Sequence, residues 1–162
     1  MKDEKKDSTL GAIPSGKRDA KLESKPALVS HKKSARPKIE PLQLPQGALI
    51  AFRRSGGFKF SSREIAIYLD GRVTCSGTDL PKQPSLAQKL SDAQIAELRR
   101  RLEQVGFLRL KLSGEQQPPD SYAYEIVAQM DGKSNFVEVF DGKIPEVLAP
   151  LIQRLTKLLP SM

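Results

Sequence analysis

The sequence predicts an α+β domain in which an antiparallel sheet of about four to five strands carries two helices packed on one face. Three observations lead to this fold class. Apolar residues alternate with a period of two in several short segments. Asp-Gly pairs, which favour tight hairpins, link some of these segments. Two further stretches have apolar residues at helical spacing. The predicted order is therefore βββαββα, and hairpin links between successive strands favour an antiparallel sheet.

The chain divides by composition into a disordered basic tail, residues 1–45, and a domain, residues 46–162. The tail is rich in Lys, Ser and Pro and contributes most of the chain's net charge of +8. Acidic residues are mixed with its lysines, and it has no aromatic residue on which a nucleic acid base could stack. These features favour a solvated linker. Nucleic-acid binding through the tail, together with Arg99 to Arg101, remains open as an alternative, as does an adaptor role.

The first predicted strand runs from Gly47 to Arg54, and the chain continues from Arg54 as Arg54-Ser55-Gly56-Gly57-Phe58. Two adjacent glycines reach positive φ at little cost, so they predict a sharp reversal of the chain. Arg54, Ser55 and Phe58 then flank a tight loop. Local chemistry alone leaves open whether this loop is a plain turn or a binding element.

The next two strands are predicted at Glu64 to Leu69 and at Arg72 to Cys75, joined by Asp70-Gly71 as a type I′ turn. Cys75 falls in the apolar alternation, so we expect a small buried side chain there, not a nucleophile. The following stretch, Ser76 to Lys89, contains Pro and Gly and is interpreted as a connection without a strand.

The clearest helix starts at Ser91, which forms a capping box with Gln94. Its apolar residues recur on one face, and Gly106 fits the left-handed position after a helix end. Arg99 to Arg101 lie on the other side, where we expect a solvated surface with local ion pairs. The apolar positions are Ile95, Leu98, Leu102 and Val105.

A proline-containing loop precedes the last hairpin, which pairs Ser121 to Met130 with Asn135 to Phe140 through Asp131-Gly132. The final helix is expected to begin at Pro150, because proline is tolerated in the first turn of a helix and not in its interior. Its leucine-rich stripe is interpreted as part of the core.

No catalytic or metal-binding constellation appears in the sequence. The single histidine, His31, lies in the tail, and the single cysteine, Cys75, allows no intrachain disulfide. The usual Cys and His zinc site cannot be built from these residues, and the common hydrolase and nucleotide-binding motifs are absent. We therefore expect a binding module without a cofactor, not an enzyme. Without a Sec signal or an apolar run of ~20 residues, we expect a cytoplasmic protein that is monomeric when free.

Several segments resemble the emfourin family over roughly residues 48–159. The resemblance is sharpest at Arg54 to Phe58, placed directly after the first strand. It continues through the helix around Ser91 to Leu98, the strand at Tyr122 to Ile126 and the segment Ile144 to Leu151. Emfourin-like proteins are bacterial inhibitors of protealysin, a thermolysin-like zinc metalloprotease.

This resemblance implies an inhibitor that occludes the active cleft of such a protease. The residues implied in partner binding are Arg54, Ser55, Gly56, Gly57, Phe58 and Phe60. Thermolysin-like enzymes favour a bulky apolar residue just after the scissile bond, so Phe58 or Phe60 would enter that pocket while Arg54 and Ser55 bond at its rim. In the competing interpretation, Phe58 packs onto its own sheet and the glycines only turn the chain.

Overall fold

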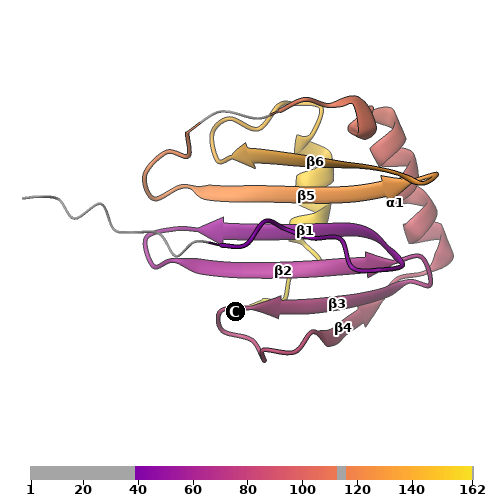
Figure 1. The fold of residues 1–162 in the computed structure, drawn as a ribbon, viewed down its shortest axis with the longest axis horizontal. Helices are drawn as coiled ribbons and strands as arrows, with labels where there is room; N and C mark the ends of the chain where they lie inside the picture. The colour runs from indigo at the N-terminus through magenta and orange to yellow at the C-terminus, as the bar shows by residue number, and fades with distance from the viewer. Residues whose placement is uncertain (1–38, 113–115, 162) are drawn as a thin grey trace, which may run out of the picture. The chain divides into compact units, whose positions relative to one another are not determined.

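The computed structural model describes residues 39–112 and 116–161, and in this part of the chain six antiparallel strands form one sheet. Both helices lie against the same face of the sheet (Figure 1). The strand order is β4-β3-β2-β1-β5-β6, so β1 lies near the middle. The strands are β1 Ala48–Gly56, β2 Ser61–Tyr68, β3 Arg72–Gly77, β4 Ser85–Lys89, β5 Tyr122–Met130 and β6 Lys133–Phe140; the helices are α1 Asp92–Gln104, the short 3-10 helix η1 Phe107–Arg109 and α2 Ala149–Thr156.

The predicted fold class is confirmed, but the predicted number of strands was too small. The additional strand is β4, which lies in the segment interpreted as a strandless connection and pairs with β3 at the edge of the sheet. All five residues of β4 are exposed. Because no side chain of β4 is buried, the strand lacks the apolar alternation from which the other strands were predicted, and its backbone pairing with β3 holds it in place.

The core lies between the helices and the sheet. Phe52, Ile65 and Ile126 come from three neighbouring strands and are almost completely buried.

The expected capping box is present, because Gln94 N donates to Ser91 Oγ (3.3 Å) and Ser91 N donates to Gln94 Oε1 (2.8 Å). The leucine stripe of α2 is buried, as predicted, and Gly106 takes the expected left-handed conformation. Neither α1 nor α2, the helices of the described residues, is long and apolar enough to cross a membrane.

Both predicted hairpins form, but the first turn differs in type. Asp131 and Gly132 both have positive φ (51° and 75°), as a two-residue primed turn requires. Asp70 does not have positive φ, so the expectation of a type I′ turn there is wrong. Gly71 N bonds to the Tyr68 carbonyl oxygen (3.0 Å), and the Gly71 carbonyl accepts from Leu90 N (2.8 Å). The backbone of Leu90 therefore helps to set this turn, a contact that local sequence does not reveal.

A short segment before β1 crosses the face of the sheet opposite the helices (Figure 1, indigo). Leu42 is buried there and packs with Leu44 against Ala51 and Val127. Residues 1–38 of the predicted tail lie outside the described residues. In the structure the compact unit begins at Glu40, so residues 40–45 are part of the folded domain.

Arg53 is the centre of a buried charge cluster on this same face. Its guanidinium donates to Glu64 Oε2 (3.0 Å), to Glu125 Oε2 (3.1 Å) and to the Glu40 carbonyl oxygen (2.7 Å). Glu64 and Glu125 flank Arg53 in the strand register, one on β2 and one on β5. Burial raises the pKa of Glu125, and the neighbouring Arg53 offsets this effect only in part.

Glu125 makes stability depend on pH in a definite direction. Because its pKa is higher in the native state than its ordinary value of 4.5, the native state takes up a proton first as the pH falls. The contribution of Glu125 to the free energy of unfolding therefore increases as the pH is lowered from above the native pKa toward 4.5. Glu125→Gln should remove this increase in urea unfolding measured between neutral and mildly acidic pH.

The exposed Glu146 offers a matched control, because Glu146→Gln also removes one carboxylate. That variant should follow the wild-type profile. Parallel profiles for wild type and Glu125→Gln would show that this buried carboxylate does not control the pH dependence.

Candidate functional site

A four-residue loop, Gly57–Phe60, joins β1 to β2 at one end of the sheet. Phe58 is 91% exposed, Lys59 is exposed and Phe60 is partly buried. The loop therefore presents a large aromatic side chain to solvent. The interpretation in which Phe58 packs onto its own sheet is wrong, because so little of the ring is covered.

The glycine pair does more than reverse the chain. Gly56 and Gly57 have φ values of 121° and 87°, so the predicted reversal at positive φ is confirmed. A Cβ at Gly56 would clash with the carbonyl oxygen of Ser121, and one at Gly57 would meet the hydroxyl of Tyr122 at 2.8 Å. The two glycines thus allow the loop to lie directly against the start of β5.

The segment before β5 braces this contact. Gly57 N donates to the Ser121 carbonyl oxygen (3.4 Å), which also accepts from Gln117 Nε2 (2.8 Å). The hydroxyl of Ser121 donates to the Pro118 carbonyl oxygen (2.7 Å). These bonds connect the base of the loop to a chain segment about 60 positions away, and they reduce the conformations that the loop can adopt.

Arg54 and Ser55 point to opposite faces of β1. Ser55 is 5% exposed and lies on the face away from the helices, so its hydroxyl is not at the surface. Arg54 lies on the helix side, where its guanidinium carbon stacks 3.8 Å from the centre of the Tyr122 ring. Arg54 Nε is buried and has no hydrogen-bond partner among the residues that the structure describes.

Arg63 lies directly opposite Arg54 in the β1–β2 register. Its Nη1 donates to the Pro160 carbonyl oxygen. Arg54, Ser61, Arg63 and Tyr122 line a small cavity of about 50 Å³ at the base of the loop. Ser61, Arg63 and Tyr122 were not among the predicted site residues, because only the strand register brings them beside Arg54.

Two tyrosines and an aspartate extend this end of the sheet. Burial raises the pKa of Tyr124, and the nearby carboxylate of Asp141 raises it further. Asp141 N donates to the Tyr122 carbonyl oxygen (2.9 Å). Tyr122 is therefore held by its backbone on one side and by the stacked Arg54 on the other.

A family model named Emfourin matches residues 52–156 of the chain. The chain belongs to the emfourin family. The matched residues include the whole loop Gly57–Phe60, the cavity residues just named and both helices. A search among curated proteins finds no match to the sequence. Emfourins form a family of protease inhibitors, so family membership supports a protease as partner and a role other than catalysis.

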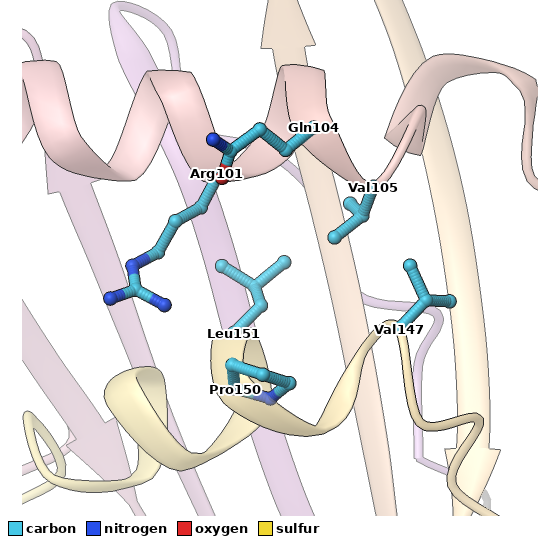
Figure 2. Close-up of a pocket in the computed structure, with 6 residues that line it drawn as sticks. All are labelled: Arg101, Gln104, Val105, Val147, Pro150 and Leu151. Carbon is cyan, nitrogen blue, oxygen red and sulfur yellow. The ribbon is translucent and has the colours of Figure 1, made fainter.

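This emfourin has a second hollow, between its two helices (Figure 2). Its volume is about 230 Å³, and it contains none of the predicted site residues. In Figure 2 Val105 of the α1 end and Val147 before α2 approach each other across the groove. The lining residues are Arg101, Gln104, Val105, Val147, Pro150 and Leu151.

The arginine run of α1 forms the ion pairs expected of a solvated face. Arg101 Nη2 donates to Glu97 Oε1 (2.7 Å) one turn earlier, and Arg99 Nη2 lies 3.9 Å from Asp131 Oδ1. Partial neutralisation makes this helix a weaker phosphate-binding surface than three free arginines would be.

The close approach at Gly56 leads to a stability prediction. Gly56→Ala should lower the free energy of unfolding by about 2–3 kcal/mol, because an alanine is strained at this φ and its methyl group displaces the Ser121 carbonyl. Gly47→Ala is the matched control, since Gly47 also has positive φ (79°) but has open space around it. That control should cost only about 1 kcal/mol. Urea unfolding of both variants measures the difference.

Equal destabilisation of the two variants would contradict the proposed packing role of Gly56. Backbone amide chemical shifts give an independent check, because Gly56→Ala should shift the signals of Ser121 and Tyr122 whereas Gly47→Ala should leave them in place.

Proposed function

We propose that this emfourin inhibits a thermolysin-like zinc metalloprotease of the protealysin type by binding in and occluding its active cleft. The observation that carries the proposal is Phe58, a fully presented aromatic ring on a braced loop in a chain of a protease-inhibitor family. The ring makes little contact with its own domain. It is therefore available to a partner at no cost in internal packing.

Phe58 has the properties of an interface anchor. A few large side chains that fill partner pockets usually contribute most of the binding energy of an interface. Burying the exposed ring of Phe58 would remove a large apolar surface from water. Phe60 is already partly buried, so it has less surface to contribute, and we assign the pocket-filling role to Phe58.

The loop is also held in a form suited to inhibition. The bonds of Ser121 to Gly57 and Gln117 hold the loop base before a partner arrives, which lowers the entropic cost of binding. Buried Ser55 pairs on both sides, with Ser62 and with Ala123. Its proposed contribution is thus to anchor the loop from within the sheet, while Phe58 and Lys59 would contact the protease.

Phe58→Ala should weaken inhibition of a cognate thermolysin-like protease by about 30-fold or more, the loss typical of an interface hot spot of about 2 kcal/mol. The free energy of unfolding should not change, because the side chain is exposed. The measurement is titration of the full chain into the protease while cleavage of a fluorogenic peptide is followed, with mass spectrometry to verify that the inhibitor stays intact.

Leu86→Ala is the matched control, since Leu86 is also an exposed large apolar residue (66%) but lies on the edge strand β4. It should inhibit like the wild type. Full inhibition by Phe58→Ala would rule out the pocket-filling role, and a larger loss for Leu86→Ala would move the interface to the sheet edge.

A further inference from the structure

The cavity at the base of the loop joins two positive charges and no negative charge. Arg54 and Arg63 are direct register partners on β1 and β2, and both line the cavity of about 50 Å³ with Ser61 and Tyr122. Like charges directly opposite on neighbouring strands destabilise a sheet. Within the described residues, neither arginine forms an ion pair with a carboxylate.

Arg53, the residue before Arg54, provides a comparison, because its positive charge is neutralised within the sheet. Arg53 is bonded to two carboxylates and one carbonyl oxygen. Arg54, one position later, makes no hydrogen bond to a described residue, and its Nε is buried without a partner. Its orientation is instead fixed by stacking on the Tyr122 ring.

Arg63 also has side-chain N–H donors that form no hydrogen bond with the described residues. One of its terminal nitrogens bonds to the neutral carbonyl oxygen of Pro160, so this bond does not neutralise the charge, and no carboxylate of residues 39–112 or 116–161 pairs with it. Ser61, whose side chain carries a hydroxyl donor, is a third polar residue of the cavity lining. The lining thus offers two guanidinium groups and a hydroxyl around a space that suits a group of only a few atoms.

We infer that this cavity is a carboxylate-binding subsite, and that its ligand is an acidic side chain of the target protease beside the cleft that receives Phe58. The inference rests on the proposed function for the identity of the partner. A carboxylate matches the planar fork of a guanidinium and can bridge two of them. The Tyr122 hydroxyl lies only 2.8 Å from where a Cβ on Gly57 would sit, so an acidic side chain bound beside Tyr122 would lie next to the loop.

The first test uses the free full-length chain and acetate as the probe. Arginine Nε–H signals and the amides of Ser61 and Tyr122 are followed by NMR as sodium acetate is added, against sodium chloride and sodium phosphate at equal ionic strength. We expect a saturable shift at Arg54 with acetate. Equal responses to all three salts, or none, would show a general charge effect and overturn the carboxylate subsite.

Variants separate the cavity from overall charge. Arg63→Gln should weaken the acetate response at Arg54 by about tenfold, whereas Arg100→Gln, which removes an exposed positive charge on α1, should leave it unchanged. Because Arg63→Gln also loses the bond to Pro160, Arg63→Lys is the second variant; it keeps a charged donor and should retain part of the response. Equal weakening by Arg63→Gln and Arg100→Gln would overturn the inference.

The second test measures inhibition of the protease. Arg63→Gln should raise the inhibition constant by about 30-fold relative to Arg100→Gln, mainly through faster dissociation. Equal inhibition by the two variants would overturn the assignment to a protease side chain. The acetate test needs no protease, so a wild-type chain that binds acetate without inhibiting would refute the proposed function and leave the carboxylate site intact.

Discussion

The contact that the loop depends on is the close backbone approach between Gly56-Gly57 and Ser121-Tyr122. β1 pairs with β2 on one side and β5 on the other, and Gly56 is the last residue of both ladders. A side chain at this position would separate β1 from β5, because the space for its Cβ is already filled by the Ser121 carbonyl. The same contact that closes the ladder therefore sets the direction in which the loop leaves the sheet.

Adjacent arginines on β1 experience opposite environments because side chains alternate across a strand. Arg53 lies on the face crossed by the segment containing Leu42, where Glu64 and Glu125 neutralise it. Arg54 lies on the helix side, at the end where the core gives way to the cavity, and it has an aromatic ring in place of a carboxylate. Arg53 is thus neutralised within the fold, whereas Arg54 pairs with no carboxylate of the described residues.

Much of the fold could be predicted from the sequence because local patterns encode it. The capping box at Ser91, the Asp131-Gly132 hairpin and the buried stripe of α2 all follow from residue spacing. β4 could not be predicted, since its exposed residues carry no apolar pattern. The loop residues at the site were found from the glycines and Phe58, but Arg63 and Tyr122 join Arg54 only through the register of three strands, which sequence spacing does not determine.

In the proposed complex, two arginines without an ion-pair partner among the described residues, beside an exposed aromatic ring, would contribute selectivity as well as affinity. Many proteins offer an apolar pocket for a phenylalanine, so Phe58 alone would discriminate weakly between proteases. A partner that covered Arg54 and Arg63 without supplying a carboxylate would bury charge at a high cost. An acidic group placed at the right distance from the apolar pocket removes that cost. Because the bonds at the base of the loop limit how far Phe58 can move from the cavity, the combination would select for geometry and charge together.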